Sequence, residues 1–240
     1  MPLEIRILGI SGSPRHGNTE ILIREALKGA RKEGAITDFL SLADKKILPC
    51  NGCMRCGEKP GALCILEDDM EEVYKRLLLA DGLVVGSPVY YGYPTGLLKS
   101  MMDRTVALRE ASKPDKKPMR LKVGGAISVA GGRHSGQETT LQMIRTWFTF
   151  MDMLPVGLVS PHTQMGATGN ASGPTNVSND KWTRSRPNKT ELEVSAVLMA
   201  EMLGSKIAIV TKIVKTGRQE TGLDVQSQYA SGVEEFLSSR

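Results

Sequence analysis

The residues best suited to chemistry are four cysteines, which lie within one stretch of fifteen residues: Cys50, Cys53, Cys56 and Cys64. Thiolates gathered this closely can hold a soft metal centre. The first three follow a CxxCxxC spacing, and a small residue such as Gly52 lets the backbone turn so that their sulfur atoms converge. Turn-forming residues then allow the chain to return with the fourth sulfur atom. The pattern therefore predicts a metal site with four cysteine ligands.

The number of cysteines bears on which centre they hold. The chain has no cysteine beyond these four, so one [4Fe-4S] cluster with four thiolate ligands uses all of them. Structural zinc sites more often pair two separated CxxC motifs. The spacing therefore favours an iron-sulfur cluster, and structural zinc and disulfide-bonded or unligated thiols are the alternatives.

Composition and charge indicate a globular protein. With 240 residues, of which 40% are hydrophobic and 24% charged, the chain is long enough for one α/β domain with an extension. Its net charge of +5 is dispersed, which argues against nucleic-acid binding and favours an acidic partner such as a small electron carrier. The sequence shows neither a signal-peptide pattern nor an apolar run of about 18 residues. We therefore expect a cytoplasmic protein that does not bind membranes.

Segments with strand and helix patterns alternate over residues 5–160. Strands are expected at 5–9, 37–40, 82–86, 123–129 and 156–160, with helices around 21–30 and at 70–80, 96–108 and 138–151. Five strands separated by helices predict an α/β fold with a doubly wound parallel sheet. A long helix at 191–214, with a possible break at Gly204, and a last helix at 225–237 form a C-terminal extension.

Ligands of such sheets bind beyond the carboxyl ends of the strands, and the first loop at this edge spans residues 9–19. It contains glycines, hydroxyl groups and Arg15, and it leads into a helix. Backbone N–H groups and the helix dipole suit such a loop to a terminal phosphate monoester. It matches neither the Walker A motif nor GxGxxG. The alternative is an ordinary loop with Asn18 or Thr19 as the helix N-cap.

Two further loops leave the same edge. The second, 86–94, contains three tyrosines whose rings could contact a flavin, or could pack in a subunit contact. In the third, 130–138, Gly131 and Gly132 allow the backbone to approach a ligand. Arg133 or Gln137 could then address a carbonyl or a ring nitrogen, and His134 is expected to be an ordinary loop residue.

Together the motifs resemble a known family. The chain is similar to the NADPH-dependent FMN reductase superfamily of flavodoxin-like proteins in Ser11-Gly-Ser-Pro14 with Gly17-Asn-Thr19, in Gly86-Ser-Pro-Val-Tyr-Tyr-Gly92, and in Gly131-Gly132 before Gly136-Gln-Glu138. The cysteine motif narrows the resemblance to the iron-sulfur flavoprotein family. Over residues 3–160, this resemblance implies a flavodoxin-like fold with a five-stranded sheet, FMN, one [4Fe-4S] cluster, and a homodimer or homotetramer.

The resemblance also implies roles for individual residues, carried over by position. The FMN phosphate would be held by Ser11, Ser13, Arg15, Asn18 and Thr19. The ring would lie against Pro88, Val89, Tyr90, Tyr91 and Gly92, with Gly131, Gly132 and Arg133 from the third loop. The iron would be bound by Cys50, Cys53, Cys56 and Cys64. No residue is assigned as a catalytic acid or base.

We interpret residues 1–161 as the FMN-binding domain, with the cysteine segment at 47–66. Residues 162–240 would form a long loop and C-terminal helices, packed on the same domain or at a dimer interface. Within them, the polar stretch 162–189 is expected either to fold over a flavin site or to form a surface loop.

The implied cofactors predict an FMN-dependent oxidoreductase. It would transfer electrons between a one-electron donor such as ferredoxin, the cluster and FMN, and onward to a small acceptor. Positive charge from Arg55 or Lys59 would help to set the potential of the cluster. One alternative is an NAD(P)H-dependent FMN or quinone reductase with a structural metal site. Another is a flavin electron carrier with no substrate of its own.

Overall fold

The computed structural model describes residues 3–58, 63–110, 117–132, 134–158, 166–170 and 194–222. Its strands are β1 (Arg6–Ser11), β2 (Ile36–Ser41), β3 (Gly82–Tyr90), β4 (Tyr93–Pro94), β5 (Val123–Ala130), β6 (Leu154–Val156) and β7 (Ala167–Asn170). Its helices are α1 (Asn18–Lys32), α2 (Met70–Leu79), α3 (Gly96–Arg104), α4 (Val106–Glu110), α5 (Gln137–Phe150) and α6 (Val194–Glu220), with a 3₁₀ turn η1 (Arg55–Gly57). Among the described helices, none has the length and hydrophobicity needed to span a membrane.

The sheet has the parallel order β2-β1-β3-β5-β6. From β1 the chain goes first to β2 and then crosses to β3 on the other side, so the switch point lies between β1 and β3. Two short strands occupy the fifth strand position, next to β5. The first half of β5 pairs with β6 through Val123–Gly125, and the second half pairs with β7 through Ile127–Ala130. The predicted five-stranded, doubly wound α/β fold is thus confirmed, and short β4 pairs antiparallel with β3.

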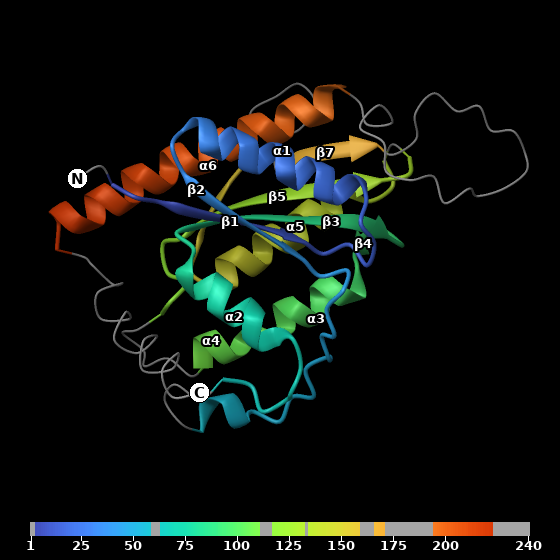
Figure 1. Ribbon diagram of the computed structural model, residues 1–240. Helices are drawn as coiled ribbons and strands as arrows, with labels where there is room; N and C mark the ends of the chain where they lie inside the picture. The colour runs from blue at the N-terminus through green and yellow to red at the C-terminus, as the bar shows by residue number, and fades with distance from the viewer. Residues whose placement is uncertain are drawn as a thin grey trace, which may run out of the picture.

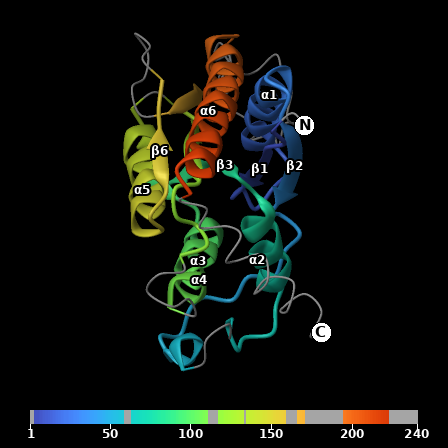
Figure 2. The same cartoon turned by 90° about the vertical axis from the view of Figure 1, so that its left-hand side faces the viewer.

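Helices cover both faces of the sheet (Figure 1). The helices α1 and α6 lie on one face, and α2, α3, α4 and α5 lie on the other, as a second view also shows (Figure 2). Every residue of β5 and the first six residues of β3 are buried. Strands covered on both faces are expected to be continuously apolar, which explains why these two were recognisable in the sequence.

Several predicted boundaries are wrong, and tertiary contacts explain the differences. Strand β3 extends to Tyr90 because it pairs with β4 across a tight turn. The last predicted strand, 156–160, instead begins at Leu154, whose N–H donates to Lys122 O at 2.9 Å. The predicted helix 96–108 is divided at Thr105 into α3 and α4. The predicted helix 225–237 lies outside the described residues.

Glycine at position 204 does not break α6, contrary to the prediction, because it serves close helix packing. A Cβ atom on Gly204 would overlap with the backbone oxygen of Ala26 in α1. A Cβ atom on Gly29 of α1 would likewise overlap with the backbone oxygen of Glu201 in α6. The two helix backbones therefore approach each other at two glycines. Helix α6 thus belongs to the helix layer that covers one face of the sheet.

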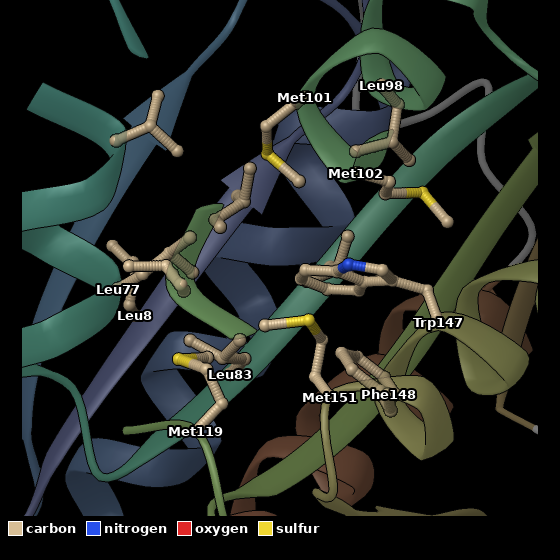
Figure 3. Close-up of a cluster of buried hydrophobic side chains, with 14 of the residues drawn as sticks. Leu8, Leu77, Leu83, Leu98, Met101, Met102, Met119, Trp147, Phe148 and Met151 are labelled. Atoms are coloured by element: carbon tan, nitrogen blue, oxygen red, sulfur yellow. The ribbon is translucent and has the colours of Figure 1, made fainter. Parts of the chain in front are cut away.

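The core between the sheet and α2–α5 is rich in methionine (Figure 3). Met101, Met102 and Met151 lie around Trp147, and their flexible side chains suit an irregular space. The indole Nε1–H of Trp147 donates to Thr105 Oγ1 at 2.8 Å, so its polar atom is paired. The same buried cluster includes Cys56, and Cys64 packs against it. This core therefore supports the cysteine segment.

We predict that Gly204→Val lowers the free energy of unfolding by about 2–3 kcal/mol, because the added side chain must push α6 away from α1. The matched control is Gly217→Ala, since a Cβ atom there meets nothing within 4 Å. We expect this control to raise stability by about 0.5–1 kcal/mol through helix propensity. Urea unfolding of both variants measures the difference, and equal effects at the two positions would contradict the packing argument.

A buried lysine directly before β5 makes the free energy of unfolding depend on pH. Lys122 is 2% exposed, and its Nζ donates to Leu77 O and Leu78 O, each at 2.8 Å. Burial lowers the pKa of Lys122 to about 7, although Asp81 acts in the opposite direction. The unfolded chain therefore holds the proton more tightly between about pH 7 and pH 10.5.

We predict that the free energy of unfolding contributed by Lys122 rises as the pH increases from about 7 towards 10.5. Urea unfolding at several pH values, compared between the wild-type protein and Lys122→Met, isolates this contribution. Parallel pH profiles for the two proteins would show that Lys122 does not titrate in this range.

Candidate functional site

Hydrogen bonds and close packing gather the three predicted loops at the carboxyl edge of the sheet. The Gly12 N–H donates to Gly86 O at 2.8 Å, and Thr95 Oγ1 donates to Gly12 O at 2.5 Å. Gly136 in the third loop packs against Gly92 so closely that a Cβ atom would overlap with the Gly92 backbone. The loops after β1, β3 and β5 therefore form one contiguous site beside the switch point.

The first loop is organised by its own hydroxyl groups. Ser13 Oγ donates to Arg15 O at 2.6 Å and accepts the Arg15 N–H at 3.1 Å. Ser11 Oγ in turn accepts the Ser13 N–H at 3.4 Å. The Ser11, Ser13 and Thr19 side chains are buried, whereas Arg15 is exposed. The residues predicted for a phosphate are thus held near one another by the loop and the start of α1.

The N-terminus of α1 fits an anionic ligand. The N-cap is Gly17, and no side chain caps the helix, so the predicted alternative of Asn18 or Thr19 as N-cap is wrong. Asn18 Oδ1 is buried without a hydrogen-bond partner, which is uncommon for a buried polar atom. Rotation of this amide can present either its oxygen or its N–H groups to a ligand. The uncapped helix end and the unpaired amide suit a phosphate monoester.

The second loop is a β-hairpin with exposed aromatic residues. Tyr91 and Gly92 have φ values of 50° and 84°, which form the tight turn between β3 and β4. The side chains of Tyr90, Tyr91 and Tyr93 are exposed, and Tyr91 is fully so. Their rings are therefore available to a flat ligand or to another subunit, which are the two alternatives that the sequence left open.

The third loop is held by the side chain of Gln137, at the start of α5. Its Nε2 donates to Gly132 O at 2.7 Å, and its Oε1 accepts the Ser135 N–H at 2.8 Å. In this arrangement Gln137 shapes the loop instead of addressing a ligand as predicted. Gly131 is exposed and Gly132 half-buried, so their backbones can be approached. Arg133 lies outside the described residues.

Two hydroxyl residues that we did not single out connect the loops. Thr95 Oγ1, besides donating to Gly12 O, accepts the Leu98 N–H at 3.1 Å and so caps α3. Ser87 Oγ accepts the Thr95 N–H at 3.0 Å and donates to Pro88 O at 2.8 Å. A threonine directly before a helical segment is a recognisable N-cap signal, but its contact with Gly12 depends on the tertiary structure.

The cysteine segment turns sharply, as its sequence predicts. Gly52 and Met54 have φ values of 68° and 57°, and Cys56 lies in the following turn, η1. The Gly52 N–H donates to Cys50 Sγ at 3.5 Å. Amide hydrogen bonds of this kind stabilise a thiolate and tune a bound cluster.

The four cysteine thiols are free, and they lie within one segment of the chain. Cys56 is buried, Cys64 half-buried, and Cys50 and Cys53 exposed. The pKa of Cys56 is raised by burial first and also by the negative charges of the other three thiolates. Among the described residues, no three His, Cys, Asp or Glu side chains are arranged as metal ligands. The donor set thus fits a soft metal in type and number, but the ligand geometry is not formed in this structure.

The cysteine segment and the three loops lie in different parts of the molecule. Figure 1 places η1, the blue-green turn at the bottom, beneath α4, whereas β4 and the carboxyl ends of the strands lie at the right. Arg55, predicted to act on the metal site, is exposed and pairs with Glu58 at 3.9 Å. Lys59 lies outside the described residues.

Comparison with known proteins gives two kinds of match. The family model described as NADPH-dependent FMN reductase matches residues 5–165. An iron-sulfur flavoprotein of Methanocaldococcus jannaschii is 41% identical over 212 residues, which are 88% of this chain and 100% of the relative. An iron-sulfur flavoprotein of Methanosarcina thermophila is 40% identical over 154 residues, which are 64% of this chain and 78% of the relative.

Solved structures confirm the flavodoxin-like fold. RosB, solved with a bound derivative of riboflavin-5'-phosphate, matches with a TM-score of 0.64 and 17% identity, over 95% of this chain and 86% of RosB. A WrbA-like flavodoxin from Agrobacterium tumefaciens matches with a TM-score of 0.55 and 17% identity, over 87% of this chain and 98% of that protein. At this low identity, the likeness concerns the fold alone.

We predict that Thr95→Val weakens FMN binding about tenfold, because it removes both the cap of α3, worth about 0.5–2 kcal/mol, and the hydrogen bond to Gly12. Thr95→Ser keeps the hydroxyl group and should bind FMN nearly as tightly as the wild type. Titration of the apoprotein with FMN, followed by flavin fluorescence, measures both affinities. Equal affinities for the two variants would show that this hydroxyl group does not organise the site.

Proposed function

Because this chain belongs to the NADPH-dependent FMN reductase family and, within it, to the iron-sulfur flavoproteins, we propose that it passes electrons from a one-electron donor such as ferredoxin to a small acceptor, through a [4Fe-4S] cluster and FMN. The protein is an FMN-dependent oxidoreductase with a role in electron transfer. A cluster exchanges single electrons and a flavin one or two, so the pair would join a one-electron donor to a two-electron acceptor.

The observation that supports this function best is that one α/β domain carries both kinds of site. Its carboxyl edge has a phosphate-type loop at an uncapped helix, and its methionine-rich core supports a segment with four free cysteines. A simple flavin reductase would need only the first site. The four cysteines are therefore the feature that indicates a second redox group.

The first loop and the start of α1 would bind the FMN phosphate. Ser11, Ser13 and Thr19 supply hydroxyl groups, Asn18 supplies an unpaired amide, and the first N–H groups of α1 are free of side-chain caps. Arg15, exposed beside them, would add a positive charge. The loop hydrogen bonds arrange these groups before the ligand arrives, which lowers the ordering cost of binding.

The hairpin and the third loop would hold the flavin ring. Pro88 to Gly92, at the tip of β3, are half-buried or exposed, and Gly131 and Gly132 allow a second chain segment to approach. The exposed tyrosines would shield the ring from water. Since the cysteine segment lies away from this edge, we propose that a homodimer or homotetramer brings the metal site of one subunit to the flavin of another.

The cysteine segment would bind the cluster through Cys50, Cys53, Cys56 and Cys64. Cys56 and Cys64 are anchored by the core, whereas Cys50 and Cys53 are exposed and would close around the metal from outside. Two of these cysteines at the surface would also let an electron donor approach. The net charge of +5 favours an acidic donor, and ferredoxin-like carriers belong to that class.

A second candidate function uses NAD(P)H. The matching family model is described as NADPH-dependent, and a protein of Chromohalobacter salexigens named NAD(P)H dehydrogenase (quinone) is 28% identical over 66% of this chain. In that case the cysteines would hold a structural metal, and FMN would take electrons directly from the nicotinamide. The two functions differ in which donor reduces the flavin.

We predict that the anaerobically isolated protein contains FMN and about four iron atoms and four acid-labile sulfides per chain. Reduced ferredoxin should reduce its flavin rapidly, and NADPH only slowly. Cys56→Ala should lose the iron and the reduction by ferredoxin but keep FMN, because this residue lies outside the flavin loops.

The matched control is Met54→Ala, which changes an exposed side chain of the same segment without removing a thiol. It should retain iron and sulfide. Folded wild-type protein without iron and sulfide would contradict the cluster. Rapid and complete reduction by NADPH, unaffected by the loss of Cys56, would favour the second candidate function.

A further inference from the structure

A buried ion pair lies at the base of the cysteine segment. Arg104, the last residue of α3, contacts Asp68 through two hydrogen bonds, Nη1 to Oδ2 at 2.7 Å and Nη2 to Oδ1 at 3.1 Å. The side chains of Arg104 and Asp68 are only 1% and 0% exposed. Two planar groups that meet in this way are fixed in both distance and orientation.

The ion pair contacts the chain on both sides of the cysteines. We call these two segments the limbs: one leads through Leu48 to Cys50, and the other leads from Cys64 through Leu66. Arg104 Nη1 donates to Leu48 O at 2.9 Å, and Nη2 donates to Leu66 O at 3.4 Å. Asp68 Oδ2 also accepts the Leu48 N–H at 2.8 Å. Leu48 lies two residues before Cys50, and Leu66 lies two residues after Cys64. The pair therefore sets the separation of the two ends of the segment.

The surrounding structure immobilises this arrangement. Asp68 Oδ1 accepts the Met70 N–H at 3.1 Å, at the start of α2. Tyr74 in α2 donates from its hydroxyl group to Arg104 O at 2.8 Å. The remaining Nε–H of Arg104 is buried without a partner. One donor of this cation is therefore not used by the protein itself.

Arg104 keeps its charge in this buried site. Burial alone would lower the pKa of Arg104, but the hydrogen bond to Asp68 and the negative charge of Asp68 raise it, and a thiolate at Cys64 acts in the same direction. The guanidinium thus stays charged, and its contact with Leu66 O at 3.4 Å lies two residues along the chain from Cys64. Arg55, by comparison, is exposed, and its charge is screened by water.

We propose that Arg104 and Asp68 are positioning residues of the cluster site: they hold the two limbs at the spacing that four-cysteine ligation requires, and the buried charge of Arg104 raises the reduction potential of the cluster. The inference rests on the proposed function, because it assigns to the ion pair a role towards the group that the cysteines would bind. Buried positive charge near a cluster favours the reduced, more negative form, and net charge is among the factors that set cluster potentials.

The buried ion pair does not by itself indicate a role in stability. Replacing a buried ion pair with apolar residues of similar volume is often neutral or stabilising, so the pair is poor evidence for stability. Its contacts with the chain are concentrated on the two limbs and on the start of α2. The structure thus ties the ion pair to the geometry of the cysteine segment.

The test separates the positioning of the limbs from the charge. In anaerobic holoprotein, we measure the rate of iron loss to a chelator and the midpoint potential of the cluster for Arg104→Gln and Arg104→Lys. Arg104→Gln should lose iron at least tenfold faster, and its potential should fall by about 59 mV, which is a tenfold change in a one-electron equilibrium. Arg104→Lys cannot hold both limbs and should also lose iron faster. Because it keeps the positive charge, its midpoint potential should stay close to that of the wild type.

The matched control is Lys122→Met, which removes another buried basic side chain, at the far end of α2. It should leave both the potential and the rate of iron loss unchanged. Thermal unfolding of the apoproteins establishes which variants are folded. If Arg104→Gln does not fold, the rate of iron loss from Arg104→Lys decides whether the ion pair positions the limbs.

The outcomes distinguish this inference from the proposed function. Wild-type rates of iron loss in the folded variants, together with an unchanged potential in Arg104→Gln, would overturn the inference and leave the cluster in place. Folded wild-type protein that contains no iron and no acid-labile sulfide would overturn both.

Discussion

The arrangement of the site depends on one constraint, which is that parallel strands end at the same edge of a sheet. The loops after β1, β3 and β5 are far apart in the sequence, yet they meet at this edge because their strands are neighbours. Short contacts then join them: Gly12 bonds to Gly86, Thr95 bonds to Gly12, and Gly136 packs on Gly92. Each loop carries only part of a ligand site, and the sheet assembles the whole.

The two faces of the sheet serve different purposes. On one face, glycines at positions 29 and 204 let α6 lie directly on α1, so a C-terminal helix completes the sandwich. On the other face, a methionine-rich core extends from the sheet to Cys56. A segment with exposed thiols such as Cys50 and Cys53 has little apolar surface of its own to bury, so this core and the hydrogen bonds at its base must hold it.

The sequence predicted well what depends on continuous or local patterns. Strands β3 and β5 were recognisable because burial on both faces requires unbroken apolar runs. Errors arose where a distant partner decides the structure. The hairpin that extends β3 to Tyr90 depends on pairing with β4, and the fifth sheet position is divided between β6 and β7 by what β5 can pair with. Gly204, read as a helix break, is instead a point of helix contact.

The sequence by itself determined the donor atoms and the local turns that carry them. The cysteine spacing, the turn at Gly52 and the hydroxyl-rich loop before α1 all act over a few residues, where the covalent chain limits the possible conformations. Only the tertiary structure decided which distant groups support them. Arg104 and Asp68 are 36 residues apart, and Thr95 and Gly12 are 83 apart. No local pattern marks such pairs, because their contact exists only once the helices have packed on the sheet.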